Sequence, residues 1–200
     1  MTRPEGAGAE MDPAVLSSRL VHSGRVVHLS IDRVRFPDGS VGELEMIRHS
    51  GAAAVLPVLD SLPHDDPRIL LVHQFRHAGG GYLYEVPAGR PDHPDEDWAD
   101  CANRELQEET GYIAGRLVLL TSILTTPGFT DERIHLFLAT DLSPGTMARD
   151  LDEFMDPISL RMSEALAMIG DGRIVDAKTI CTLLYANRWS ALRERPAPEG

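Results

Sequence analysis

Short apolar runs separated by turn-forming residues fill most of the first half of the chain. Runs rich in β-branched, leucine and aromatic side chains are typical of β-strands. Pro37-Asp38-Gly39-Ser40 suits a tight turn, so the runs on either side of it should form a hairpin. The pattern predicts strands at 26–31, 34–36, 41–47, 52–59, 69–75 and 82–86, and later at 116–124 and 133–139.

Helical spacing replaces the strand pattern at three places. Asp97 is a suitable N-cap, and a stripe of Ala99, Ala102 and Leu106 follows it at the spacing of one helix flank. This stripe should pack on the core while the glutamates of the same helix face away from it. Further helices are expected at 163–169, closed by Gly170-Asp171-Gly172, and from a cap at Asp176 to about residue 192.

Strands interleaved with helices and returning hairpins predict an α/β layered domain with a mixed sheet. We interpret residues 51–193 as that domain and residues 16–50 as a small N-terminal β extension. Residues 1–15 and 194–200 have the composition of flexible tails.

Composition narrows the class of protein. The net charge of −12 argues against a nucleic-acid surface, which needs clustered Lys and Arg. Two cysteines, Cys101 and Cys181, provide neither a disulfide framework nor a zinc ligand set, and Cys101 reads as a buried structural thiol. The chain has no signal-peptide pattern and no apolar stretch of membrane-spanning length, so we expect a cytoplasmic protein that binds no membrane.

The most informative segment is Arg104-Glu105-Leu106-Gln107-Glu108-Glu109-Thr110-Gly111-Tyr112. On a helix, its three glutamates fall within about one quadrant, where like charges repel. A hard divalent cation, which prefers oxygen ligands, is a chemical reason to keep them together. The plain alternative is a solvated surface helix rich in glutamate.

Residues upstream extend this segment into a longer motif. Glu96 lies eight positions before Arg104, and Gly89 precedes Glu96. The whole resembles the Nudix box, G-x5-E-x7-R-E-U-x-E-E-x-G-U, in which U is apolar. The loop between Gly89 and Glu96 is one residue longer than the pattern, and Tyr112 stands where an aliphatic residue is usual.

Other segments are similar to one Nudix branch, the ADP-ribose pyrophosphatases. Pro127 follows Tyr112 by fifteen positions, as in that branch, and the segments 74–76, 85–89 and 126–132 match its shorter motifs. The resemblance implies a Nudix-like α/β/α sandwich with a mixed sheet. It also implies a homodimer that pairs through the N-terminal β extension.

The resemblance implies a metal site on the predicted helix. The expected ligands are Glu105, Glu109 and the carbonyl of Ala88, and Glu108 is either a further ligand or an acid beside them. The expected cofactor is Mg²⁺, with Mn²⁺ as the alternative. The residues expected to brace the box are Gly89, Glu96, Arg104 and Gly111.

The resemblance also implies substrate-binding and catalytic residues. Arg76 matches a phosphate-binding arginine of the family. The simpler interpretation is an ordinary surface arginine at the end of a strand. The other expected substrate-binding residues are Glu85, Phe129, Arg48 and His49. A catalytic base is expected from an acidic loop, with Glu153 as the first candidate, Asp152 as the second, and Glu108 of the box as the alternative.

The resemblance therefore implies metal-dependent hydrolysis of the pyrophosphate in ADP-ribose or a related nucleoside diphosphate sugar. Val27 stands where relatives often have an adenine-stacking aromatic, which keeps a GDP-sugar or another nucleotide sugar as an alternative. Tyr82, Tyr84 or Phe129 are candidates to replace that aromatic. A ligand sensor without catalysis is the third reading, and the intact glutamate cluster disfavours it.

Overall fold

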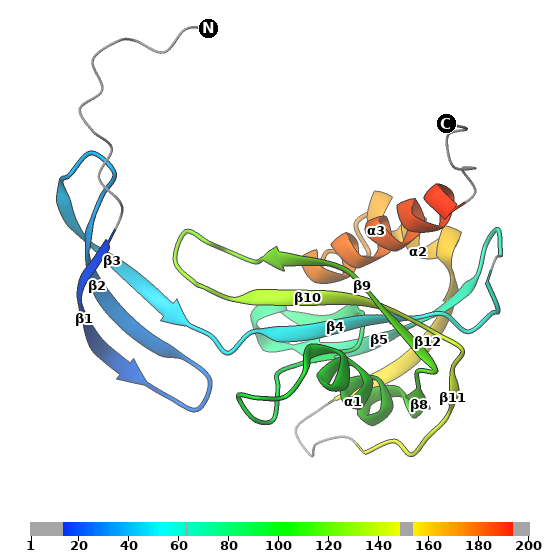
Figure 1. The fold of residues 1–200 in the computed structure, drawn as a ribbon. Helices are drawn as coiled ribbons and strands as arrows, with labels where there is room; N and C mark the ends of the chain where they lie inside the picture. Colours follow the sequence, from blue (N-terminus) through cyan, green and yellow to red (C-terminus); the bar gives the residue numbers. More distant parts are fainter. Residues whose placement is uncertain (1–13, 63, 149–153, 194–200) are drawn as a thin grey trace, which may run out of the picture. The chain divides into compact units, whose positions relative to one another are not determined.

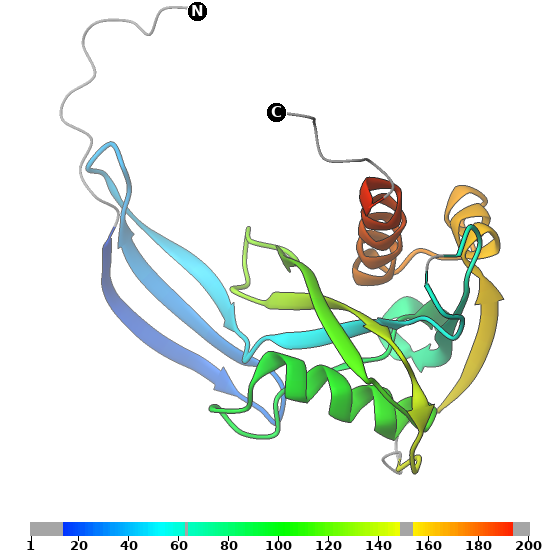
Figure 2. The same cartoon turned by 45° about the vertical axis from the view of Figure 1, so that its right-hand side comes forward.

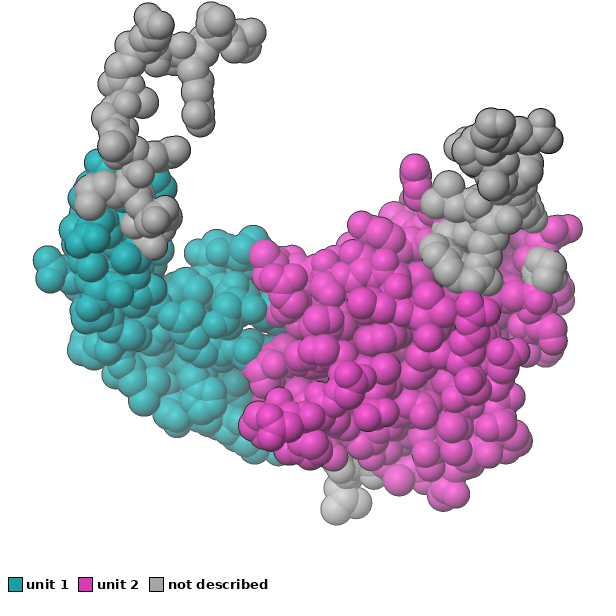
Figure 3. Space-filling view, viewed as in Figure 1, with its two compact units in different colours: residues 1–49, 126–132 teal, residues 50–125, 133–200 magenta. Residues whose placement is uncertain are grey.

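The structure, a computed structural model, describes residues 14–62, 64–148 and 154–193, with side chains described as far as Arg188. The chain divides into two compact units, which Figure 3 colours separately. Unit 1 comprises residues 1–49 and 126–132, and unit 2 comprises residues 50–125 and 133–200. Each unit is described by itself.

A four-stranded mixed sheet forms the centre of unit 2. Its order is β7 (Ala88–Gly89), β4 (Ala52–Pro57), β10 (Arg133–Thr140) and β9 (Arg116–Leu124). Strands β4 and β10 are parallel, and the other pairs are antiparallel. Every residue of β4 is buried, as expected for a strand with helices on both faces.

Helices cover the two faces of this sheet (Figures 1 and 2). Helix α1 (Trp98–Thr110) packs on the face that carries Ala53 and Val55, and helices α2 (Met162–Gly170) and α3 (Ala177–Arg193) pack on the opposite face. The alternation of β4 side chains therefore builds two cores, one on each side. This confirms the predicted α/β/α sandwich. Within the described residues, no helix is both long and apolar enough to cross a membrane.

A second, antiparallel sheet lies in the same unit, in the order β12 (Met155–Arg161), β5 (Arg68–Arg76) and β6 (Gly81–Glu85). Strand β12 was not predicted, because Pro157 interrupts its apolar pattern. Proline is tolerated there because β12 is an edge strand, with β5 as its neighbour on one side. Short elements complete the unit: η1 (His77–Gly79), β8 (Tyr112–Ile113) and β11 (Ser143–Pro144).

Unit 1 contains an antiparallel sheet of β1 (Ala14–Ser23), β2 (His28–Arg35) and β3 (Val41–Arg48). The predicted hairpin around Pro37-Asp38-Gly39-Ser40 is confirmed by the pairing of β2 with β3. The predicted strand start at residue 26 is wrong. Gly24 N–H donates to the Val27 carbonyl at 2.8 Å, so these residues form the turn between β1 and β2.

Candidate functional site

Helix α1 begins and ends at the residues that the sequence predicts. The Asp97 carboxylate accepts a hydrogen bond of 2.8 Å from the Ala99 amide, which confirms it as the N-cap. Gly111 has a φ of +75° and donates its amide to the Gln107 carbonyl at 2.8 Å. That left-handed conformation favours glycine and ends the helix after the last glutamate.

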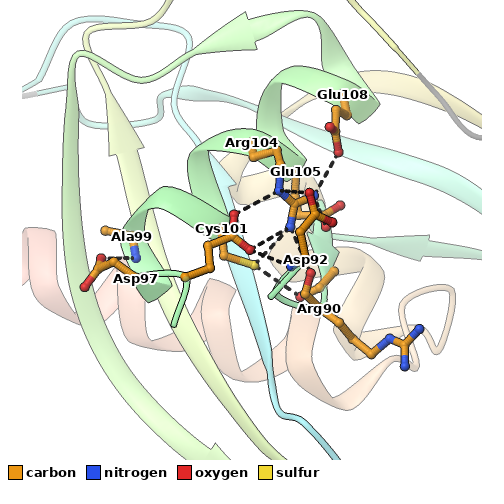
Figure 4. Close-up of polar contacts among 10 residues, drawn as sticks. Arg90, Asp92, Asp97, Ala99, Cys101, Arg104, Glu105 and Glu108 are labelled. Carbon is orange, nitrogen blue, oxygen red and sulfur yellow. Dashed lines mark hydrogen bonds and ion pairs between the residues drawn. The ribbon is translucent and has the colours of Figure 1, made fainter. Parts of the chain in front are cut away.

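The guanidinium of Arg104 forms hydrogen bonds to several other residues of the site (Figure 4). It donates to both carboxylate oxygens of Glu96, at 3.0 and 3.2 Å, and to Glu105 and Glu108 at 2.8 and 3.0 Å. It also donates to the carbonyl of Arg90 at 2.8 Å. Burial would lower the pKa of Arg104, but the bonds to Glu96 and Glu105 raise it above its ordinary value. Arg104 therefore stays charged and holds the carboxylates together.

The three glutamates of the helix differ in exposure. Glu105 is 9% exposed and Glu109 is 2% exposed, whereas the side chain of Glu108 is 37% exposed. Glu105 and Glu109 are therefore buried, although they lie on a different flank of α1 from the stripe that packs on the core. Strand β7 contacts α1 on this side, and Gly89 of β7 lies directly against the carboxylate of Glu105.

Gly89 allows a close approach between β7 and the carboxylate of Glu105. A Cβ added at Gly89 would lie 2.0 Å from Oε1 of Glu105 and 2.2 Å from its carboxyl carbon. A side chain at position 89 fits only if the Glu105 carboxylate or β7 moves, which favours glycine as the first residue of the box. The Gly89 carbonyl also accepts a long contact of 3.7 Å from the thiol of Cys101.

The donor chemistry here fits a hard divalent cation. Three carboxylates lie on one flank of α1, and the backbone of Gly89 borders Glu105 without an intervening side chain. Among the described residues, no three His, Cys, Asp or Glu side chains are already arranged as a metal-binding group. Arg104 instead donates to Glu105 and Glu108.

A second charged cluster surrounds Glu85, which is 1% exposed. Arg76 donates to both of its oxygens at 2.9 Å, and Nζ of Lys178 donates to Oε2. Burial would raise the pKa of Glu85, but hydrogen bonds and ion pairs with Arg76 and Lys178 outweigh burial and lower it. The structure thus brings Arg76 and Glu85 together and adds Lys178, to which the sequence analysis assigned no role.

The start of α3 holds Lys178 in place. Asp176 accepts hydrogen bonds from the Thr179 amide and hydroxyl, at 3.0 and 2.6 Å, and from Nζ of Lys178 at 3.0 Å. The Thr179 hydroxyl in turn accepts from the Val86 amide at 2.9 Å. The expected cap at Asp176 could have indicated this arrangement, because the residues that follow a cap are fixed in direction.

The other predicted residues fall in unit 1 or outside the described residues. Arg48, His49 and Phe129 belong to unit 1, in which Arg48 pairs with Asp32 and Asp131. The candidate bases Asp152 and Glu153 lie outside the residues that the structure describes.

The candidate replacements for a stacking aromatic differ in their surroundings. Tyr84 stacks on His73 with ring centroids 4.6 Å apart, and Tyr82 lies 5.0 Å from the same ring. Phe129 is 49% exposed. The prediction that Cys101 is a buried structural thiol is confirmed, because the residue is fully buried and burial raises its pKa to about 12.

Comparison with known proteins agrees with this geometry. The family model of the NUDIX domain matches residues 49–182. A methanol dehydrogenase activator of Bacillus methanolicus is 37% identical over 190 residues, covering 94% of this chain and 100% of the relative. An ADP-ribose pyrophosphatase of Bacillus subtilis (strain 168) is 35% identical over 185 residues, covering 92% and 97%.

A solved structure described as an ADP compounds hydrolase has the same fold. The TM-score is 0.79, and the match covers 94% of this chain and 100% of the other at 22% sequence identity. At that identity, the likeness is one of architecture.

We predict that Gly89→Ala destabilises the protein by about 1–3 kcal/mol, because the new methyl group must displace the Glu105 carboxylate or β7. Thermal unfolding should show a fall in Tm of several degrees. Gly170→Ala is the matched control, since a Cβ there meets nothing within 4 Å. Equal Tm values for the two variants would show that the close approach at Gly89 is not a real constraint.

Proposed function

This chain belongs to the Nudix family, and we propose that it hydrolyses the pyrophosphate of ADP-ribose or a related nucleoside diphosphate sugar. The products would be a nucleoside monophosphate and a sugar phosphate, which for ADP-ribose are AMP and ribose 5-phosphate. The Bacillus subtilis relative carries the name of that activity and aligns over nearly its whole length.

One observation carries the proposal: the carboxylate flank of α1 is assembled around Arg104 and directly borders the backbone at Gly89. A merely solvated helix has no reason to bury Glu105 and Glu109, since burying charge is costly unless it has a use or a partner. The arrangement therefore supports an active enzyme over a ligand sensor, which has no need of such a cluster.

We assign the cation site to Glu105, Glu109 and the carbonyl of Ala88, with Glu108 as a further ligand or a neighbouring acid. The expected ion is Mg²⁺, with Mn²⁺ as the alternative. Such an ion, when bound, supplies charge neutralisation at phosphate oxygens and activation of water.

Arg76 is suited to hold a phosphate group. Its side chain is 42% exposed while its partner Glu85 is buried, so the guanidinium is anchored at one side and accessible at the other. Lys178 divides its charge between Glu85 and Asp176, so the accessible cation of this cluster is Arg76. A guanidinium fixed on one side can bind the oxygens of a substrate's pyrophosphate with its other side.

The decisive test of the activity is a panel of nucleotide sugars incubated with Mg²⁺ and assayed for released monophosphate. We expect ADP-ribose to be hydrolysed with the largest kcat/KM. A GDP-sugar that is hydrolysed faster would replace ADP-ribose as the substrate. A failure to cleave any nucleotide sugar would favour the sensor reading.

We predict that Glu109→Gln lowers kcat by about 10²-fold or more. Loss of a partner that only orients a metal ligand typically costs 10- to 100-fold, so loss of a ligand should cost at least as much. Glu164→Gln, an exposed glutamate in the first turn of α2, is the control and should keep wild-type turnover. Full turnover of the Glu109→Gln enzyme, or of the wild type in excess chelator, would rule out the metal assignment.

We predict that Glu153→Gln lowers kcat by roughly 10²–10⁴-fold with little change in KM, as expected for loss of a general base. Parallel kinetics of Asp152→Asn distinguish the second candidate from the first. If both variants turn over like the wild type, the base lies elsewhere, and Glu108 becomes the candidate to test next.

We predict a homodimer that pairs through the sheet of unit 1. That sheet leaves large apolar side chains exposed: Val15 61%, Leu20 62%, Val21 47%, Val41 46% and Leu44 42%. Apolar surface of this kind favours burial against a partner. Light scattering should give twice the mass of the 22.0 kDa chain, and Leu20→Glu should shift it toward the monomer. A wild-type protein with the monomer mass at micromolar concentration would contradict the prediction.

A further inference from the structure

Within unit 2, the start of α3 is joined to the end of β6 through two neighbouring residues, Lys178 and Thr179. Nζ of Lys178 donates to Oε2 of Glu85, the last residue of β6. The Thr179 hydroxyl accepts from the amide of Val86, which follows Glu85. Both α3 residues also donate to the carboxylate of Asp176. Two successive residues of the helix therefore hold two successive residues of the chain at the end of the strand.

The Glu85 cluster comprises two cations, Arg76 and Lys178, and two carboxylates, Glu85 and Asp176, so its charges balance. The side chains of Glu85, Lys178 and Asp176 are 2%, 12% and 19% exposed. The side chain of Arg76 is 42% exposed. Among these four residues, Arg76 is therefore the one that an anion can reach.

Arg76 is held among negative charges. Its hydrogen bonds to Glu85 raise its pKa above the ordinary value despite burial, and the charges of Glu109 and Asp176 act in the same direction. Lys178 compensates Glu85 and Asp176 from their other side. Without Lys178, Arg76 would be the one cation of the cluster beside these carboxylates, and little net positive charge would remain for a phosphate.

We propose that Lys178 is a positioning residue for the substrate's pyrophosphate: by compensating Glu85 and Asp176, it leaves the charge of Arg76 available to a phosphate. Lys178 acts through these carboxylates and does not itself contact the substrate. Its ammonium is a compact charge with three donors, so it can serve two converging carboxylates in a largely buried place. It is also the only lysine of the chain. The proposal rests on the phosphate-binding role proposed for Arg76.

Single variants at Lys178 and Asp176 should act in opposite directions. Lys178→Met should raise KM for ADP-ribose about tenfold with kcat within about threefold, because an uncompensated charge near the phosphate site weakens binding. Asp176→Asn keeps a favoured cap for α3 and removes a negative charge, so KM should stay the same or fall. A rise of KM in Asp176→Asn would contradict the proposal even if Lys178→Met does not fold.

The double variant Lys178→Met with Asp176→Asn separates three roles of Lys178. It again balances one cation with one carboxylate, so KM should return to within about threefold of the wild-type value. A direct contact between Lys178 and phosphate cannot be restored in this way, and KM would stay as high as in Lys178→Met. A structural role would lower the Tm of Lys178→Met and leave its KM unchanged.

Arg161→Met is the matched control for loss of an ion-paired cation in unit 2. Arg161 pairs with Asp60 and lies opposite Arg68, at the other end of β5 from Arg76. That end is about 26 Å away along the strand. The variant should therefore leave KM unchanged.

Calorimetric titration with inorganic pyrophosphate in excess chelator measures the same charge balance without turnover. Binding by the wild type should be lost in Arg76→Met, which assigns the signal to this cluster. It should weaken about tenfold in Lys178→Met and recover in the double variant.

Failure of this proposal and failure of the proposed function give different results. A wild type that cleaves no nucleotide sugar overturns the function, and the pyrophosphate titration then still tests Lys178. Unchanged KM and pyrophosphate affinity in Lys178→Met, or no recovery in the double variant, overturn the positioning role. Wild-type binding of pyrophosphate that is absent, or that survives Arg76→Met, overturns the phosphate site on which that role rests.

Discussion

The guanidinium of Arg104 is the interaction on which the site depends. Three glutamates within five positions of one helix repel one another, so the cluster is stabilised by a positive charge nearby. Arg104 supplies that charge to Glu105 and Glu108 and is itself fixed by Glu96 and by the Arg90 carbonyl. The loop before α1 and the helix are thereby joined into one rigid piece.

Buried carboxylates paired with cations also occur elsewhere in the molecule. Glu85 is buried between Arg76 and Lys178, and Asp32 is buried against Arg48. In each case a buried carboxylate fixes the direction of a cation that remains partly accessible. Burial of a charge contributes little net stability, but it specifies where its partner points. A phosphate-cleaving enzyme needs such fixed charges more than it needs added stability, since preorganised charge requires no rearrangement during reaction.

The sequence predicted the box helix with its cap at Asp97 and its end at Gly111, because both rules depend only on neighbouring residues. It predicted an α/β layered domain with a mixed sheet because strand patterns alternate with helix patterns, and the resemblance to the Nudix box implied the sandwich. It missed β12, whose Pro157 is tolerated only at a sheet edge. The burial of Glu105 and the choice of Glu85 as the partner of Lys178 arise between residues distant in sequence. The cap at Asp176 indicates how α3 begins, but not which carboxylate Lys178 meets.

The most direct test of the central claim, that the carboxylate flank of α1 is a metal site, is anomalous diffraction from crystals soaked with Mn²⁺. An anomalous difference map should show a peak coordinated by Glu105, Glu109 and the carbonyl of Ala88. A map without a peak there at saturating Mn²⁺, or with its strongest peak on other residues, would contradict the account.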